Sequence, residues 1–285
     1  MEEKNFNKYP RPAVAADMVI FTILNEKGED FRKLDNKKLK LLLIQRNIEP
    51  YLNKYALPGG FVRCKETIDD AAKRELYEET GVICSNLSQL HTISDLHRDE
   101  RGWVVSCSYL ALIDGSKLIL NAGTDAKSAM WFDVSYTLDS EEIQTSPNEA
   151  IINRYYKLLV RYNVTVLEAR ILEKKTINYN SDSVEITVIE SKGFAFDHAK
   201  IIAYGIRELL ERAERTDILF NLMPEYFTLS ELQQVYELLL NKKFTAANFR
   251  RKIADKVVET GRMTKNSAHR PSRLYKRKLF NAGGI

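Results

Sequence analysis

Three glutamates have the spacing of one helical face, and they are the side chains of this chain best suited to bind a cation. Glu75, Glu78 and Glu79 are three and four residues apart, so on a helix their carboxylates emerge on one side. Such carboxylates repel one another unless a cation lies between them. Hard oxygen ligands favour Mg²⁺ or Mn²⁺, which can polarise a phosphorus atom and activate bound water. The backbone carbonyls of Gly59 and Gly60 can approach the same ion because glycine has no Cβ.

These glutamates belong to a longer pattern with fixed spacing over residues 60–82. The segment fits G-x5-E-x7-R-E-U-x-E-E-x-G-U, where U is apolar, at every specified position. It resembles the Nudix box, and this resemblance implies a domain that hydrolyses or binds a nucleoside diphosphate linked to another group. By the same resemblance Glu78 and Glu79 match the main metal ligands and Glu75 a further ligand or a base. Arg74 matches the arginine that orients a box glutamate.

Two further roles are expected around this box. Glu66 is expected to orient the helix rather than bind the metal. The catalytic base stays unassigned, because some Nudix proteins place it on a distal loop. By rough position the candidates are Glu141, Glu142 and Glu149.

The C-terminal part of the chain is basic. Residues 201–285 hold 16 Lys and Arg against 9 Asp and Glu. The basic residues are densest between Lys242 and Lys278, where 13 of them accompany only Asp255 and Glu259. Such a patch is what a polyanionic partner requires.

Two short helices joined by a turn are predicted in this basic region. Thr228 and Glu231 form a capping-box pattern, and Thr245 can cap a second, basic helix over residues 246–258. A strand over residues 272–276 follows. This order is typical of a winged helix-turn-helix, whose second helix enters the major groove of double-stranded DNA. The predicted DNA contacts are Thr245, Asn248, Arg250, Arg251, Lys252, Arg270 and Arg273.

Over residues 11–276 the chain resembles the Nudix-related transcriptional regulators. The matching stretches are RPAVAADMVIF, LPGGFVRCKET, HRDERGWVVSCSYLAL, FAFDHAKIIAYGIREL, FTLSELQQVYELLL, FTAANFRRKI and HRPSRLYK. Members of that family join a Nudix domain to a C-terminal winged helix, and they include repressors of NAD metabolism and sugar-responsive regulators. The resemblance implies a ligand such as ADP-ribose. A helix-turn-helix that reads a two-fold operator also favours a homodimer.

Three arginines are predicted to contact the ligand. Whether the bound ligand is cleaved or only bound stays open. Arg98 and Arg101 precede Gly102 in a charged turn, and Arg46 is the third candidate. Regulators of the resembled family often lack box glutamates and bind ADP-ribose without cleaving it, whereas here all are present. The chain is therefore either an active hydrolase fused to a DNA-binding module or a ligand-responsive regulator whose box only binds. A Nudix pyrophosphatase whose basic part binds RNA, or is only a structural accessory, is the remaining alternative.

A sheet flanked by helices is predicted to position these side chains. Alternating or continuous apolar runs predict strands, and apolar residues at a period of 3.6 predict helices. Strands are expected at residues 13–21, 40–45, 87–93, 103–113 and 129–134, and helices at residues 67–80 and 148–162. The predicted fold class is α+β, a Nudix fold with a mixed sheet between helices, followed by a winged helix-turn-helix domain.

The chain is predicted to divide into three parts. Residues 1–163 form the Nudix domain, residues 164–200 an appended β-hairpin and linker, and residues 201–285 a connector helix and the winged helix. Asp197 is expected to cap the connector helix, and His198 to cap it or pack against it.

Composition limits the compartment and the cofactors. No apolar run approaches the ~18–20 residues of a membrane span, and the N-terminus lacks the pattern of a secretory signal. A cytoplasmic location without membrane contact is therefore predicted. Cys64, Cys84 and Cys107 are irregularly spaced and support neither a disulfide framework nor a zinc site. Mg²⁺ or Mn²⁺ is the only cofactor expected.

Overall fold

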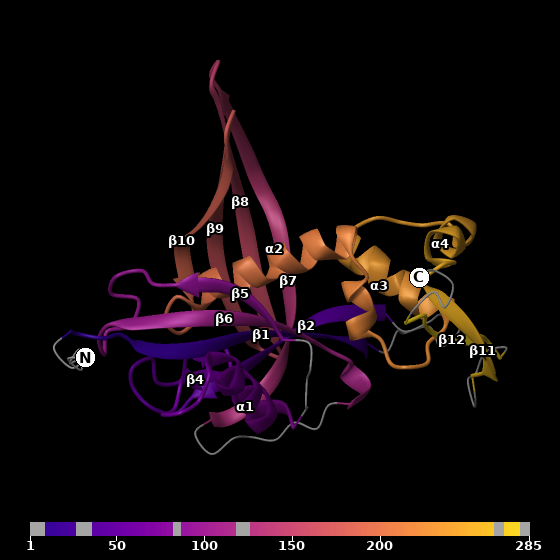
Figure 1. Cartoon of the computed structure of the whole chain (residues 1–285), viewed down its shortest axis with the longest axis horizontal. Helices are drawn as coiled ribbons and strands as arrows, with labels where there is room; N and C mark the ends of the chain where they lie inside the picture. Colours follow the sequence, from indigo (N-terminus) through magenta and orange to yellow (C-terminus); the bar gives the residue numbers. More distant parts are fainter. Residues whose placement is uncertain (1–8, 27–35, 82–86, 118–125, 265–270, 280–285) are drawn as a thin grey trace, which may run out of the picture.

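The computed structural model describes residues 9–26, 36–81, 87–117, 126–264 and 271–279, and most of their strands lie in one sheet (Figure 1). This ten-stranded sheet has the order β10-β9-β8-β7-β2-β1-β6-β5, with β3 paired to β2 and β4 to β1. Strands β1 and β6 run parallel and β1 and β2 antiparallel, so the sheet is mixed as predicted. The strands are β1 (Ala13–Glu26), β2 (Asn36–Arg46), β3 (Tyr55–Ala56), β4 (Gly59–Phe61), β5 (Ser88–Ile93), β6 (Val104–Ile113), β7 (Ala126–Thr145), β8 (Glu149–Tyr162), β9 (Thr165–Asn178) and β10 (Asp182–Lys192).

Strand β1 crosses the middle of the sheet and is buried on both faces. Met18 and Ile20 pack with helix α1 (Ile68–Thr80), whereas Val19 and Phe21 pack on the face covered by helix α2 (His198–Arg215). Successive side chains of a strand point to opposite faces, so a strand between two helical layers needs an unbroken apolar run. The predicted arrangement of a mixed sheet between helices is confirmed.

The predicted helix over residues 148–162 is wrong, because this segment is strand β8. It pairs with β7 on one side and with β9 on the other from Glu149 to Tyr162. Its apolar residues fit a helical stripe, but they are mostly β-branched or aromatic, which suits a pleated surface. Tyr156 of β8 stacks on Tyr136 of β7 with ring centroids 4.4 Å apart. Pairing along both edges therefore decides the structure of this segment.

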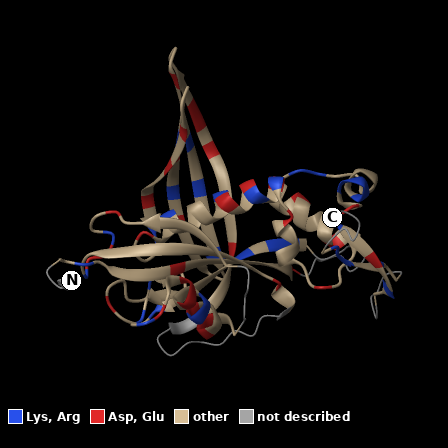
Figure 2. Ribbon diagram, in the orientation of Figure 1, with Lys and Arg blue, Asp and Glu red and all other residues tan. Residues whose placement is uncertain are grey.

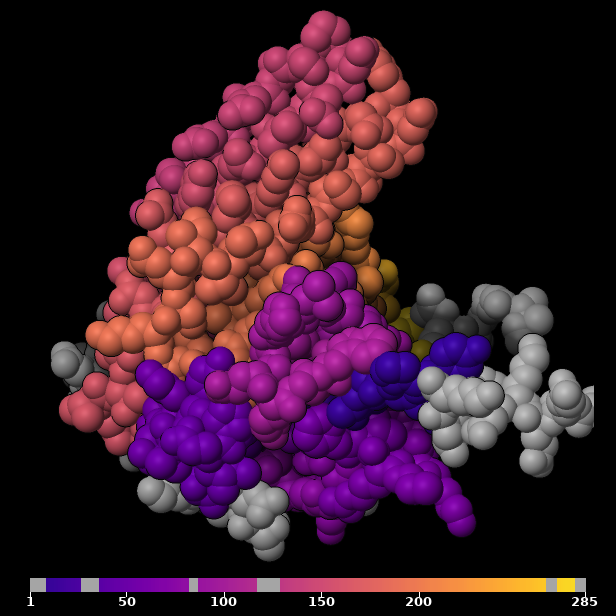
Figure 3. All heavy atoms as spheres, turned by 90° about the vertical axis from the view of Figure 1, so that its left-hand side faces the viewer, coloured from indigo at the N-terminus to yellow at the C-terminus, as the bar shows by residue number. Residues whose placement is uncertain are grey.

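Strands β7 to β10 continue beyond the rest of the sheet as an arm (Figures 1 and 3). The predicted hairpin forms as β9 and β10, whose register joins Asp182 to Ile177. It is not a separate element, however, because β9 also pairs with β8 and so extends the main sheet. The sheet thus runs through the boundary predicted at residue 163.

The C-terminal part forms the predicted winged helix. The threonine hydroxyl and the glutamate carboxylate of the capping box, Thr228 and Glu231, accept hydrogen bonds from each other's backbone N–H. The second helix ends at Ile253 rather than at residue 258, because the β-branched Val257 and Val258 begin a strand instead. The elements are the 3-10 helix η3 (Ile218–Leu222), α3 (Leu229–Leu240), α4 (Ala246–Ile253), β11 (Val257–Met263) and β12 (Arg273–Arg277), with β11 and β12 paired as the wing.

One hydrophobic core joins the sheet to the winged helix. Helix α3 packs against β2, and η3 packs against β1 and β6. Leu219 of η3, Val235 of α3 and Phe249 of α4 belong to the same buried cluster as Phe21 of β1 and Ile202 of α2. The two parts therefore cannot separate without exposing apolar surface to water. Within the described ranges, no helix has the length and apolar character needed to cross a membrane.

Candidate ligand pocket and DNA-binding surface

A pocket of about 800 Å³ opens where β1, β2, β4, α1, the β5–β6 loop and the start of α2 meet. It brings together residues that are far apart in the sequence. The predicted metal and ligand residues that line it are Gly60, Glu75, Glu78, Glu79, Arg46, Arg98 and Arg101.

Helix α1 presents the glutamates to this pocket because both of its ends are fixed. The hydroxyl of Thr67 accepts a hydrogen bond from the backbone N–H of Asp70 at 3.1 Å. Gly81 ends the helix with φ of 68°, in the left-handed region that favours glycine. The Tyr109 hydroxyl of β6 donates to Asp69, and Leu76 is buried against the sheet. The opposite side of the helix is therefore free to line the pocket.

Glu79 is the glutamate whose charge is least compensated. The residue is only 8% exposed, and its Oε2 has no hydrogen-bond partner in the described part of the chain. Burial, followed by repulsion from Glu75 and Glu78, raises the pKa of Glu79 to about 7. Burial also raises the pKa of Glu75. Buried carboxylates of this kind are stabilised by a proton or by a cation.

Arg74 holds the neighbouring carboxylates in place. Its Nε and Nη2 donate to the two oxygens of Glu66 at 2.7 and 3.1 Å, and its Nη1 donates to Glu75 at 2.5 Å. The bonds from Arg74, with one from the backbone N–H of Arg63, lower the pKa of Glu66 to about 2. Among the described residues, no group of three or more His, Cys, Asp and Glu side chains is arranged so that it could hold a metal ion. Arg74 thus joins Glu66 to Glu75, and the orienting roles expected of Glu66 and Arg74 stay predictions.

Gly59 is required by the closeness of β4 to β1. A Cβ on Gly59 would collide with the carbonyl oxygen of Ala16, and its φ of 158° is one that other residues rarely adopt. A Cβ on Gly60 would meet only the carboxylate at the end of the Glu75 side chain.

The three predicted arginines are in different situations. Arg98 is 5% exposed at its side chain, and its Nε and Nη2 both donate to the carboxylate of Asp197 at 2.8 Å. Arg101 donates to Asp99 at 2.6 Å, yet its side chain is 42% exposed. Arg46 donates through Nε to the carbonyl of Pro50 at 2.8 Å, while its buried Nη2 has no partner in the described residues. Burial, and then repulsion from Arg101, lowers the pKa of Arg46.

Asp197 is the N-cap residue of α2, as expected, but only its backbone carbonyl accepts hydrogen bonds from the first turn. Its side chain makes no cap hydrogen bond to α2, because the carboxylate is bound by Arg98. The ion pair joins the β5–β6 loop to the start of α2. Arg46 and Arg101 are left as the arginines with donors best placed for a ligand.

The candidate catalytic bases lie away from the pocket. Glu141 and Glu142 are on the outer part of β7, and Glu149 begins β8 beside the tip of the arm (Figure 1). Glu141 accepts a hydrogen bond from Arg154 at 2.6 Å. A position near the box would require residues 148–162 to form a helix packed on the sheet. As strands, β7 and β8 carry these glutamates outward instead.

Basic residues are frequent along α4 (Figure 2, blue). Asn248, Arg250, Arg251 and Lys252 are exposed, whereas Phe249 and Ile253 are buried in the core shared with α3. A basic helix held by two buried side chains has the arrangement of a recognition helix.

The other predicted DNA contacts differ in their surroundings. The hydroxyl of Thr245 caps α4 by accepting from the backbone N–H of Asn248 at 3.3 Å. Arg273 of the wing forms an ion pair with Glu259 at 3.1 Å. Arg270 lies outside the described residues. Lys256, three residues after the end of α4, pairs at 2.6 Å with Asp217, which directly precedes η3.

Comparison with known proteins identifies both parts of the chain. The family model described as "NUDIX domain" matches residues 17–151, and the model described as "NrtR DNA-binding winged helix domain" matches residues 219–277. The ADP-ribose pyrophosphatase of Methanocaldococcus jannaschii is 39% identical over 132 residues, which cover 46% of this chain and 68% of that protein. The chain belongs to the Nudix superfamily.

The likeness of this Nudix protein to other chains extends through the winged helix. The ADPR responsive transcriptional repressor NtrR of Acinetobacter baylyi is 28% identical over 271 residues, 94% of this chain and 83% of the repressor. A MutT/nudix family protein from Enterococcus faecalis has a TM-score of 0.64 at 28% identity, covering 95% of this chain and 88% of that one. Shewanella oneidensis NrtR, solved with a 27mer DNA, has a TM-score of 0.56 at 26% identity and 93% coverage of both chains.

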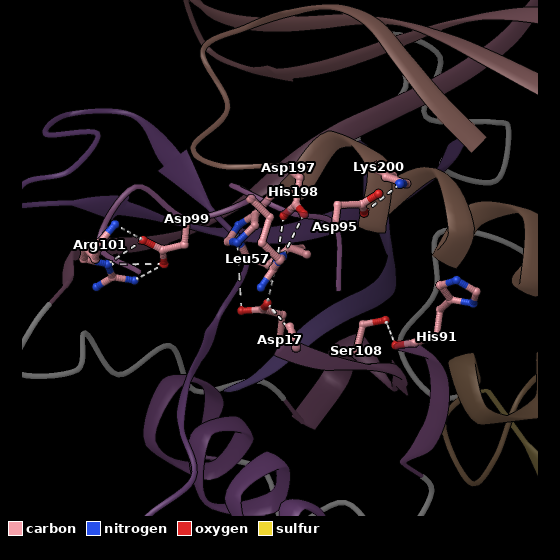
Figure 4. A network of polar contacts seen from close by, with 12 residues as sticks. Asp17, Leu57, His91, Asp95, Asp99, Arg101, Ser108, Asp197, His198 and Lys200 are labelled. Carbon is pink, nitrogen blue, oxygen red and sulfur yellow. Dashed lines mark hydrogen bonds and ion pairs between the residues drawn. The ribbon is translucent and has the colours of Figure 1, made fainter. Parts of the chain in front are cut away.

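Two buried residues of the Nudix pocket, Asp17 and His198, were not predicted as site residues (Figure 4). The Ser106 hydroxyl donates to Asp17 at 2.5 Å, and Arg98 lies 3.6 Å from the same carboxylate. His198 packs as predicted and accepts, through Nδ1, a hydrogen bond from the backbone N–H of Leu57 at 2.8 Å. Burial lowers the pKa of His198. The one signal for Asp17 was a lone acid inside the apolar run AVAADMVIF.

Proposed function

We propose that this protein is a ligand-responsive, DNA-binding repressor of transcription whose Nudix pocket takes up ADP-ribose or a similar nucleoside diphosphate derivative. The observation that carries the proposal is the single hydrophobic core shared by the Nudix sheet, α2 and the winged helix. The ligand pocket and the DNA-binding module both pack on α2. Ligand binding can therefore change the affinity for DNA through this helix. The similar repressor of A. baylyi, which its name describes as ADPR responsive, supports the choice of ligand.

The pocket has the charges that a nucleoside diphosphate needs. Phosphate oxygens bind best to guanidinium groups, which donate several hydrogen bonds in one plane. Arg46 has an unused buried donor, and Arg101 is accessible at the same pocket. Acidic side chains of α1 complete the lining, and they would repel a phosphate unless a cation lies between them.

Hydrolysis of the ligand is a second activity that the site supports. The unpaired Oε2 of Glu79 favours a Mg²⁺ or Mn²⁺ ion held by Glu75, Glu78, Glu79 and the backbone of Gly60. Such an ion, when bound, polarises phosphorus and activates water. Arg74, bound to both Glu66 and Glu75, would fix the position of the Glu75 carboxylate beside such an ion. The alternative function is accordingly a Nudix pyrophosphatase whose C-terminal module is an accessory.

The winged helix is proposed to bind double-stranded DNA as part of a homodimer. Arg250, Arg251 and Lys252 would supply phosphate and base contacts from α4, and Arg273 would supply them from the wing. A protein that acts on chromosomal DNA must share its compartment, so the proposed location is cytoplasmic.

Two assays on the full-length protein test these alternatives. Fluorescence anisotropy with a labelled duplex of the protein's own upstream region, with and without ADP-ribose, measures DNA binding and its response. Chromatographic separation of ADP-ribose from AMP and ribose 5-phosphate, after incubation with Mg²⁺, measures hydrolysis. A ligand-dependent change in DNA affinity supports the regulator, whereas turnover without DNA binding would leave only the pyrophosphatase.

A further inference from the structure

We infer that Phe196 is the residue through which an occupant of the Nudix pocket acts on the winged helix. The inference rests on the proposed function and names the contact that produces the response. Phe196 lines the pocket and lies two residues before the first residue of α2. The pocket wall and the helix that leads to the DNA-binding module are therefore one continuous piece of chain.

The segment before α2 is fastened to the pocket by backbone hydrogen bonds. The N–H of Tyr55 on β3 donates to the carbonyl of Gly193 at 3.0 Å, and the N–H of Ala195 donates to the carbonyl of Tyr55 at 2.8 Å. Tyr55 and Phe194 form a parallel bridge. Phe196 thus follows directly on a segment that is fixed on the sheet side.

Phe196 itself has an unusual conformation and unusual neighbours. Its φ is 50°, in the left-handed region that non-glycine residues rarely occupy and that the surrounding structure must stabilise. The guanidinium carbon of Arg46 lies 4.8 Å from the centre of its ring, and that of Arg101 lies 5.3 Å away. The ring of Tyr51 packs against it at 4.7 Å. The two arginines proposed to contact the ligand therefore both rest on this ring.

This arrangement makes the position of Phe196 depend on the pocket's occupant. Arg46 and Arg101 repel each other, and the Nη2 of Arg46 is buried without a partner in the described residues. An anionic ligand group that binds both guanidinium groups draws them toward itself and so changes their contacts with the ring. A residue in a sparsely populated backbone region is easily released to another conformation when such contacts change.

The residues next to Phe196 transmit this change to α2. The carboxylate of Asp197 is bound twice by Arg98, which is itself part of the pocket wall. His198 accepts the hydrogen bond from Leu57, just before the glycine pair of the box. The start of α2 is thus held to two separate parts of the pocket, the β5–β6 loop and the segment between β3 and β4.

Helix α2 then extends to the winged helix without a break. It crosses β1 closely at Gly205, where an added Cβ would lie 2.7 Å from the side chain of Val19. Its buried side chains, among them Ile206 and Leu209, share a core with η3 and α3. Near its C-terminal end, Glu214 pairs at 2.9 Å with Lys242, which lies in the turn between α3 and α4. A shift at the first turn therefore displaces the winged helix, since a packed helix moves as a unit.

The test compares two substitutions that each remove one aromatic ring from the same pocket. Phe196→Gly removes the ring and permits the left-handed backbone. Phe61→Ala is the matched control, because Phe61 also lies under Arg101, at 5.4 Å, but belongs to β4 and not to the chain entering α2. For each protein, calorimetry gives the affinity for ADP-ribose, and anisotropy gives the affinity for the upstream duplex without ligand and at saturating ADP-ribose.

We expect saturating ADP-ribose to change the duplex affinity of the wild type and of Phe61→Ala at least fivefold. For Phe196→Gly the change should fall below about twofold, although ligand and DNA still bind separately. A full response in Phe196→Gly would overturn the inference and leave the proposed function standing. A wild type that binds ADP-ribose and DNA without any response would instead overturn the proposed function.

Hydrogen exchange in the wild type gives a second measurement that needs no variant. On addition of ADP-ribose, amide exchange should change over residues 196–206 as well as in the pocket. If ADP-ribose slows amide exchange in the pocket but not over residues 196–206, ligand binding does not change the segment at Phe196 and the inference fails.

Discussion

Glu79 combines burial with an uncompensated negative charge. The ionised side chain should therefore lower the free energy of unfolding by a measurable amount. Its pKa is raised to about 7 from an ordinary value of 4.5, so the folded protein favours the protonated acid. The stabilisation from protonation is complete below about 4.5 and is lost as the pH rises through about 7. Metal-free Glu79→Gln should therefore be more stable than the wild type by ~1–3 kcal/mol at pH 8.5, and nearly equal to it at pH 5.

Thermal unfolding in EDTA at the two pH values checks this expectation. Exposed Glu100→Gln serves as the control and should change neither midpoint. Mg²⁺ should then raise the midpoint of the wild type and not that of Glu79→Gln, and any Mg²⁺-dependent turnover should disappear in the variant. Equal gains from Mg²⁺ in both proteins would contradict the assignment of Glu79 as a metal ligand.

Residues of the site divide into those that local spacing could predict and those that it could not. Glu75, Glu78 and Glu79 are on one helix, so their common direction follows from the helical period. Asp17 and His198 come close only when β1 and α2 pack together, and their carboxylate and imidazole lie 3.9 Å apart. The spacing of residues within a helix or a strand cannot predict a contact between two such distant elements. Arg98 shows the same limit, since its partner Asp197 lies 99 residues away.

At the scale of elements, α4 is the part whose surface chemistry is most directly testable. Its exposed Arg250 and Arg251 lie on a helix that Phe249 and Ile253 hold in place. Replacing both arginines by alanine should weaken binding to the upstream duplex by ~1–3 kcal/mol for each arginine that touches the DNA, and reduce the salt dependence by about two units of slope. Affinity for ADP-ribose should not change, because neither side chain lines the pocket.

A charge-matched control separates local contacts from overall charge. Lys54 and Lys192 are exposed and lie on the Nudix part of the chain, so replacing both by alanine removes the same charge elsewhere. Anisotropy titrations over a range of salt concentrations measure all three proteins. An equal loss of affinity in the two double variants would show that α4 makes no specific contact.

Helices and strands could be predicted from the sequence where the local pattern of residues favoured the same structure as the contacts with neighbouring elements. The capping box at Thr228 and the glycine stop at Gly81 are local, and both helices begin or end as predicted. For β8 the apolar residues fitted either a helix or a strand, and the flanking strands β7 and β9 decided between them. The end of α4 was missed for a related reason, because Val257 is paired in the wing with Arg277.

At the scale of the whole molecule, the shared core predicts that the two parts depend on each other. A chain ending at Arg215 would lose η3 and α3, whose Leu219 and Val235 are fully buried in this core. Such a fragment should lose DNA binding, but it should also unfold at a lower temperature and bind an apolar dye, because the face of β1, β2 and β6 becomes exposed. Calorimetry and dye fluorescence beside the full-length protein check this. A fragment as stable as the whole chain would mean that the core is not shared in solution.

Association is the remaining property of the whole molecule that the proposed function requires. One α4 reads only one half-site, whereas two copies related by a two-fold axis present two recognition helices about 34 Å apart, one turn of DNA. The arm offers surface for such an association, since Leu138, Ile143 and Tyr179 are exposed apolar or aromatic side chains on its strands and turn. Light scattering at micromolar concentration should therefore give twice the chain mass of 32.9 kDa. Footprinting should show protection with two-fold symmetry, and a monomer with an asymmetric footprint would contradict the dimer without affecting the ligand pocket.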